Sequence, residues 1–287
     1  MVARLFPFVQ LEYPWALGPE DGRYVLRAQA GGEPEHVVVL TTVGAARGAG
    51  RRPARRGRSR SADPEPAPVP VARATVIDPA DVPDEQRAQA WLGQLDAERE
   101  IESAVAVLNR VLFAQRIAAA DAYLHEISAA QALAIRAGWG TGEQVADGAW
   151  TAARELPWSE PRGRRRASAL RPQERFSALL GGHERALLCE ELALRARADL
   201  DQGRLAHAAL ELQGAYACAL SELGAERHAE LSERAAELQE LHAGVQRTAT
   251  TYRTGERVEE PDAEVVRHAL ERLEATLRAR TAYAPRA

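Results

Sequence analysis

The residues best suited to catalysis or metal binding are widely scattered along this chain. The sequence has seven His and two Cys, but none of the His residues has a second His or Cys at metal-ligand spacing. His125 and His183 are each followed by Glu, as in zinc proteases, yet Ala129 and Leu187 stand where the second His would be. The sequence also lacks the G-x-S-x-G motif of serine hydrolases. We therefore predict no catalytic, metal or cofactor-binding residues from motifs.

The glycines of Gly138–Gly142 could superficially form a phosphate-binding loop. Glu143 stands where a dinucleotide-binding loop needs its third Gly, and the chain contains no Lys, which excludes a Walker loop. We expect the tip of a β-hairpin here, followed by another strand. If a small molecule binds, Trp139 and Trp150 are the candidate contacts. An enzyme would have its pocket beside this tip, with Trp139, His125 or Glu143 in it.

Positive charge is concentrated in two arginine-rich segments. Residues 47–60 hold seven Arg and residues 162–172 hold five, with no acidic residue in either, whereas the whole chain has a net charge of −4. Such segments could bind phosphate groups in a salt-sensitive way. Arg without any Lys is also typical of GC-rich codon usage, so codon bias is an alternative explanation, and neither segment contains an aromatic residue for base stacking. The candidate anion contacts are Arg51, Arg52, Arg55, Arg56, Arg164, Arg165 and Arg166.

The overall composition indicates an intracellular helical protein. Hydrophobic residues make up 46% of the chain but aromatic residues only 5%, which favours a core of Leu, Val and Ala. Cys189 and Cys218 lie in helical sequence and are expected to be small buried residues, not half-cystines. The N-terminus does not resemble a signal peptide, and no stretch reaches the roughly 18 apolar residues of a membrane helix. We expect a cytoplasmic bacterial protein without a membrane partner.

The N-terminal half predicts an α+β domain over residues 1–156. Strands are expected at 5–13, 23–27 and 36–43, joined by short turns into an antiparallel meander, and a fourth strand at 73–77 is added to this sheet. Between them, residues 46–72 are predicted to be a disordered insertion rich in Arg and Pro. A long helix over 83–126, with Asp81 as its N-cap, is expected to cover the sheet. The glycine-tipped hairpin completes the domain.

The C-terminal half predicts an all-α domain of about four helices over residues 174–281, after an Arg-rich linker at 157–173. The clearest helical stripe runs from Leu205 to Leu223. A Thr-rich segment, 248–254, is expected to separate the last two helices, with Asp262 capping the final one.

Residues 189–222 resemble one tetratricopeptide unit. Ala196, Gly203 and Ala208 are spaced like the small positions of that family, and Leu212 and Ala215 like its further apolar and small positions. The match covers about a tenth of the chain, and no second copy follows. Because Glu191 and Asp199 stand where the family has large aromatic residues, the resemblance implies a helical hairpin and no ligand contacts.

These observations favour a non-catalytic protein–protein interaction or scaffolding role. The helices combine apolar faces with acidic outer faces, as expected for binding a partner helix or for self-association. Two alternatives remain open: non-specific nucleic-acid binding through the Arg-rich segments, and a small-molecule enzyme with its pocket near residues 138–142.

Overall fold

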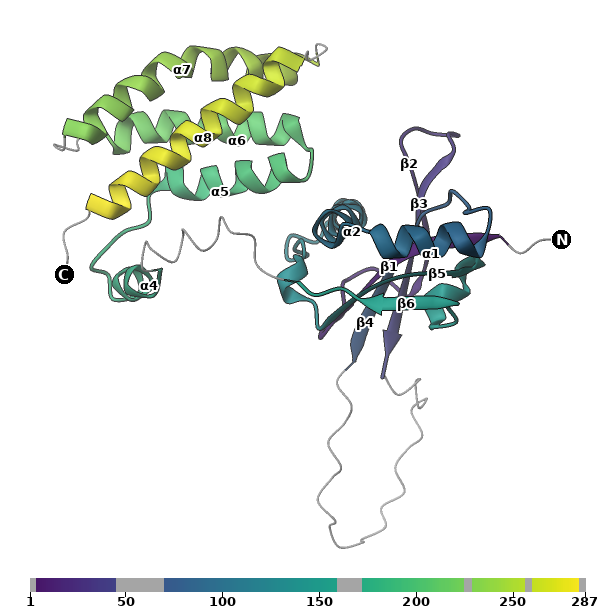
Figure 1. Ribbon diagram of the computed structural model, residues 1–287. Helices are drawn as coiled ribbons and strands as arrows, with labels where there is room; N and C mark the ends of the chain where they lie inside the picture. Colours follow the sequence, from purple (N-terminus) through teal and green to yellow (C-terminus); the bar gives the residue numbers. More distant parts are fainter. Residues whose placement is uncertain (1–3, 45–69, 159–171, 225–228, 256–259, 284–287) are drawn as a thin grey trace, which may run out of the picture. The chain divides into compact units, whose positions relative to one another are not determined.

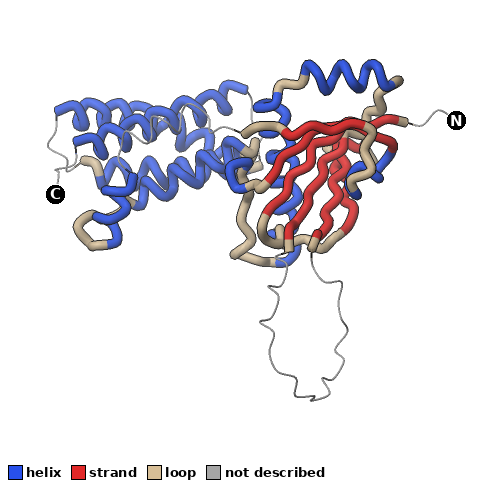
Figure 2. The backbone as a smooth tube through the Cα atoms, turned by 60° about the horizontal axis from the view of Figure 1, so that its bottom comes forward, coloured by secondary structure: helices blue, strands red, loops and turns tan. Residues whose placement is uncertain are grey.

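The computed structural model describes residues 4–44, 70–158, 172–224, 229–255 and 260–283. The chain divides into two compact units, Met1–Ser159 and Glu160–Ala287. The first contains a β-sheet with helices, and the regular elements in the described residues of the second are all helices, so the predicted order of an α+β part followed by an all-α part is correct (Figures 1 and 2). Most of the predicted Arg/Pro insertion and of the second Arg-rich linker lies outside the described residues.

The first unit is built on one six-stranded antiparallel sheet. Its strand order is β2-β3-β4-β1-β5-β6, so β1 lies between β4 and β5. The expected meander of the first three strands is therefore wrong: β2 and β3 form a hairpin, but β1 pairs with β4 and β5 instead of β2. Residues 73–77 do join this sheet, next to β1. The strands are β1 Leu5–Tyr13, β2 Gly22–Arg27, β3 Pro34–Val43, β4 Val71–Ile77, β5 Ala134–Thr141 and β6 Ala152–Glu155.

Two helices cover one face of this sheet in place of the single predicted helix. Helix α1 spans Glu85–Gln94 and α2 spans Ala97–Ala119. The break occurs because Asp96 caps α2, accepting a hydrogen bond from the backbone N–H of Arg99, while Leu95 has extended backbone angles. Asp84, not Asp81, caps α1. Buried residues of both helices, such as Leu92 and Leu108, pack on alternate residues of the strands.

The opposite face of the sheet is partly covered by a short 3-10 helix, η2 Gly142–Asp147. Gly138 and Gly140 lie inside β5 and face this layer, so the predicted hairpin tip and following strand are wrong. A Cβ atom on Gly138 would lie 2.8 Å from the Phe8 ring, and one on Gly140 would lie 2.8 Å from Val145 of η2. These glycines therefore permit close packing across the sheet and do not form a turn.

The second unit consists of five helices in its described part. A short helix, α4 Pro172–Leu180, precedes four longer ones: α5 Leu188–Asp201, α6 Leu205–Glu222, α7 Ala229–Thr254 and α8 Glu260–Tyr283. Helices α5 and α6 form a hairpin that turns at Gly203, whose φ of 70° favours glycine. Alanines and leucines of α5 to α8, with Tyr216, form one core.

The Thr-rich segment does not interrupt the helices as predicted. Helix α7 runs through it, with Thr248 and Ala249 buried. The hydroxyls of Thr250 and Thr251 hydrogen-bond to the carbonyls of Gln246 and Arg247, four residues earlier, which is compatible with a continuous helix. The helix ends at Thr254, just before Gly255, whose φ is 74°. Asp262 is not the N-cap of α8, which begins at Glu260. None of the described helices has the length and apolar character needed to cross a membrane.

Candidate functional site

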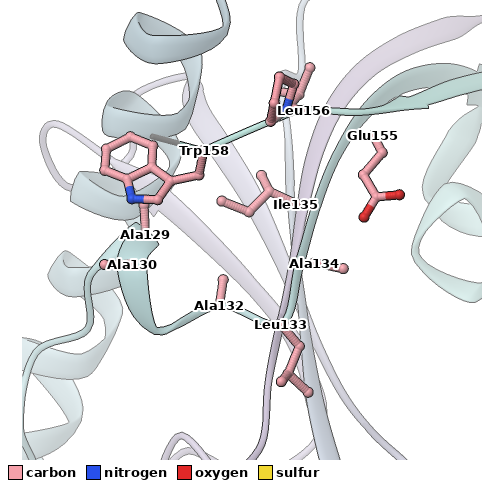
Figure 3. Close-up of a pocket in the computed structure, with 10 residues that line it drawn as sticks. Ala129, Ala130, Ala132, Leu133, Ala134, Ile135, Glu155, Leu156 and Trp158 are labelled. Carbon is pink, nitrogen blue, oxygen red and sulfur yellow. The ribbon is translucent and has the colours of Figure 1, made fainter. Parts of the chain in front are cut away.

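A depression lined mainly by apolar side chains lies at one end of the sheet in the first unit. It has a volume of about 520 Å³ and is lined by the segment after α2, the start of β5 and the segment that follows β6 (Figure 3). We call it the alanine hollow, because Ala129, Ala130, Ala132 and Ala134 form much of its wall. Their side chains are too short to fill the space between β5 and Trp158.

The backbone that forms the alanine hollow is firmly held. The Leu133 N–H donates to the Glu12 carbonyl at 2.7 Å, and the Leu156 N–H donates to the Ile135 carbonyl at 2.8 Å. On the helix side, the buried Asn109 side chain exchanges two hydrogen bonds with the backbone of Ile127, at 3.0 and 2.9 Å. The hollow is therefore pre-formed, so a ligand would not have to order it.

Nine of the ten residues that line the alanine hollow have apolar side chains, and backbone groups add polar surface to its wall. Ile135 and Leu156 form its buried floor, and the Trp158 ring lies over Ala129 (Figure 3). Its only ionisable lining residue is Glu155, whose side chain points away from the Trp158 ring (Figure 3). The lining thus contains no nucleophile paired with a base, and its chemistry suits an apolar side chain.

Strand β6, which borders the alanine hollow, is an edge strand. Among the described strands it pairs only with β5, over Ala152–Glu155. Leu156 turns its backbone N–H toward β5, so the alternate residues Ala153 and Glu155 turn theirs toward the open edge. An extended chain could add to this edge next to the hollow.

The two tryptophans predicted as ligand contacts lie on opposite faces of the sheet. Trp139 is 3% exposed and packs in the core beneath α1 and α2. Trp150 is half-buried on the other face, where its ring stacks on Phe8 with centroids 5.7 Å apart. Trp139 and Trp150 therefore cannot line one pocket together.

The other residues considered for an enzyme pocket do not converge. His125 is exposed in the segment after α2, and Glu143 is exposed on η2, where it pairs with Arg23. The candidate anion contacts in the two Arg-rich segments lie outside the described residues. Within the described ranges, no group of three or more His, Cys, Asp or Glu residues is arranged to hold a metal ion.

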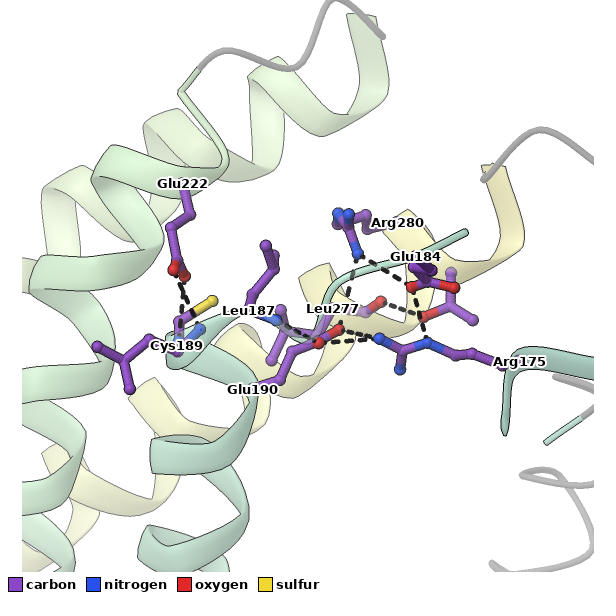
Figure 4. A network of polar contacts seen from close by, with 10 residues as sticks. Arg175, Glu184, Leu187, Cys189, Glu190, Glu222, Leu277 and Arg280 are labelled. Carbon is purple, nitrogen blue, oxygen red and sulfur yellow. Dashed lines mark hydrogen bonds and ion pairs between the residues drawn. The ribbon is translucent and has the colours of Figure 1, made fainter. Parts of the chain in front are cut away.

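A polar network of the second unit joins three of its helices, α4, α5 and α8 (Figure 4). Arg175 of α4 bonds Glu184 at 3.0 Å and bonds both carboxylate oxygens of Glu190 at 2.7 and 2.8 Å. Arg280 of α8 lies 3.7 and 3.8 Å from the same two carboxylates. The charges are balanced, so this network fastens α4 to α5 and α8 and presents no free charge to a ligand.

The start of α5 is capped by a carboxylate from the end of α6. Glu222 accepts hydrogen bonds from the backbone N–H groups of Leu188 and Cys189, at 3.0 and 3.1 Å, and from the Cys189 thiol. Although burial opposes the charge, these hydrogen bonds and Arg280 lower the pKa of Glu222. Burial and the adjacent carboxylate raise the pKa of Cys189, which makes it a protonated donor and not a nucleophile.

No motif in the sequence marks the alanine hollow. Alanines at 129, 130, 132 and 134 look like ordinary helix formers, and only the tertiary structure brings Trp158 beside them. Comparison with known proteins adds no further guide: no family model, no curated protein and no solved structure matches this chain. The assignment of function therefore depends on the geometry alone.

Proposed function

We propose that this protein is a non-catalytic protein-interaction module of the bacterial cytoplasm, and that the alanine hollow accepts an apolar side chain from an extended segment of a partner protein. The observation that carries this proposal is a rigid apolar hollow beside the open edge of β6. Backbone pairing with Ala153 and Glu155 would supply affinity, and the hollow would select the side chain.

The apolar side chains that line the hollow support binding of an apolar side chain. Burying an apolar side chain against this lining would stabilise the complex by about 25 cal/mol for each Å² of apolar surface removed from water. The short edge of β6 offers few backbone hydrogen bonds, so we expect a weak, reversible complex. Because Glu155 points away from the hollow, the ligand needs no positive charge.

The proposal is tested by selecting peptides that bind the purified full chain from a phage-displayed random library, then measuring their affinities by calorimetry. Ala132→Trp fills the alanine hollow and should weaken the selected peptides by at least about ten-fold, as expected for loss of one buried side chain. Ala90→Trp, on the exposed side of α1, is the matched control and should leave affinity unchanged.

Two results would contradict the proposal. One is a library that yields no binding peptide. The other is a set of peptides whose affinities Ala132→Trp and Ala90→Trp affect equally.

A further inference from the structure

Helix α7 has an outer face that no other described helix covers. Ala236 and Ala243 lie along its centre, seven residues apart, and both are exposed. Thr250 continues the same line after another seven residues and is also exposed. Positions seven apart lie nearly one above another on a helix, so these small side chains form a straight seam. Small residues allow two helix axes to approach to about 8 Å.

Three charged side chains on one flank of this seam have no ion-pair partner among the described residues. Glu233, Glu240 and Arg247, again seven apart, are exposed and form no ion pair with another described residue. By contrast, Glu230 pairs with Arg234 on the same helix.

Glu237, on another side of α7, pairs with Arg272 of α8. The unpaired charges of the seam flank are therefore set apart from those that stabilise the unit.

The charges along this flank can pair with those of a second α7 that runs in the opposite direction. The two acids occupy the N-terminal half of the face, and Arg247 lies beyond its midpoint. If a second α7 runs antiparallel, with the two-fold axis beside Ala243 and Gly244, Glu240 of each copy lies opposite the partner's Arg247. A parallel pair would instead bring opposite flanks of the two helices together, so that Glu240 would lie beside the partner's Gln239 and would not reach the partner's Arg247.

The other flank of the seam is polar and uncharged near the same midpoint. Gln239 and Gln246 are exposed there, and Gln246 lines a hollow of about 690 Å³ between α6 and α7. The same two-fold axis places Gln239 near the partner's Gln246, where side-chain amides can both donate and accept. Both flanks thus favour the same axis.

We propose that α7 forms an antiparallel homodimer interface, in which Ala236 and Ala243 pack at the seam and Glu240 pairs with the partner's Arg247. The occupant of this face is a second copy of the chain. The inference does not depend on the alanine hollow, which belongs to the other unit and is tested by other variants.

The dimer is tested by sedimentation velocity on the full chain over a dilution series, where association appears as a species of twice the 31.2 kDa chain mass. Glu240→Arg and Arg247→Glu each convert two attractive pairs into repulsive ones, and each should raise the dimer Kd by at least about ten-fold. The double variant restores opposite charges and should recover the original Kd. Raising salt from about 50 to 500 mM should weaken the wild-type dimer.

Glu271→Arg is the matched control, because Glu271 is exposed on α8 and forms no ion pair with another described residue. It should leave the Kd unchanged. A second, steric test is Ala243→Trp, which should block the seam whatever the salt. Unchanged circular dichroism would show that each variant remains folded.

Three outcomes would overturn the proposal. The wild-type chain could remain monomeric at the highest concentration. It could form a dimer that neither charge reversal nor Ala243→Trp weakens, which would place the interface elsewhere. The double variant could also fail to recover the affinity lost in the single ones.

Discussion

The packing around Gly138 predicts a clear loss of stability when this residue is replaced by Ala. A Cβ atom there would lie 2.4 Å from the Ala152 carbonyl oxygen, 2.8 Å from the Ala153 Cβ atom and 2.8 Å from the Phe8 ring. Two of these neighbours are backbone or Cβ atoms of β6, which cannot move without separating β6 from β5. Gly138→Ala should therefore destabilise the first unit by about 3 kcal/mol, at the upper end for overpacking.

The assay follows urea unfolding by tryptophan fluorescence. All five Trp residues lie between 15 and 158, so this signal reports the first unit. With a urea dependence of about 2 kcal/mol/M, the midpoint should fall by about 1.5 M. Gly93→Ala is the control: nothing lies within 4 Å of its added Cβ atom, and Ala in a helix is better than Gly by about 1 kcal/mol.

The result that would refute this reasoning is a Gly138→Ala midpoint within about 0.3 M of the wild type, given usual extrapolation errors. It would mean that β6 shifts at little cost, and that the edge beside the alanine hollow is not rigid. A midpoint lowered equally by Gly93→Ala would also count against it.

Two further substitutions test the polar contacts that hold each unit together. Asn109→Leu removes the hydrogen-bond partners of both the N–H and the carbonyl of buried Ile127, and should lower the free energy of unfolding by about 2–4 kcal/mol, measured by tryptophan fluorescence. A decrease below about 1 kcal/mol would contradict these hydrogen bonds. Glu222→Gln weakens the cap of α5 and should cost about 1 kcal/mol at neutral pH, measured by thermal unfolding with circular dichroism while tryptophan fluorescence serves as control. Because the folded protein lowers the pKa of Glu222, its carboxylate stabilises the fold above its ordinary pKa of 4.5 and loses this effect as the pH falls below it. The difference between wild type and Glu222→Gln should therefore shrink in acid, and a difference that grows in acid would disprove the assignment.

Local patterns in the sequence predicted most elements but few of their partners. The strand at 73–77 and the helix from Leu205 to Leu223 were predictable, because alternation and helical spacing of apolar residues depend only on nearby positions. The order of strands was not, because pairing β1 with β4 and β5 is a choice among distant segments. Short turns at residues 18–22 and 31–32 indicated a meander, yet only the second joins paired neighbours, β2 and β3.

The sequence patterns gave wrong predictions for two glycines and two threonines. Gly138 and Gly140 resembled a turn, but their function is to let Phe8 and η2 approach the strand. Thr250 and Thr251 resembled a helix break, but their hydroxyls bond to the preceding turn and the helix continues. In both cases the same residue type is compatible with two local structures, and only the residues that surround it in the folded protein decide which one forms.

The sequence by itself determined the division into an α+β part and an all-α part, since the period of apolar residues changes from two to 3.6 along the chain. It also contained the Glu and Arg spacing of α7, although which side of that helix remains exposed depends on how α6 and α8 pack against it. The alanine hollow was decided by tertiary structure alone. Four small side chains become a cavity only when the sheet, the segment after α2 and Trp158 surround them, because a void is a property of packing and not of any local sequence.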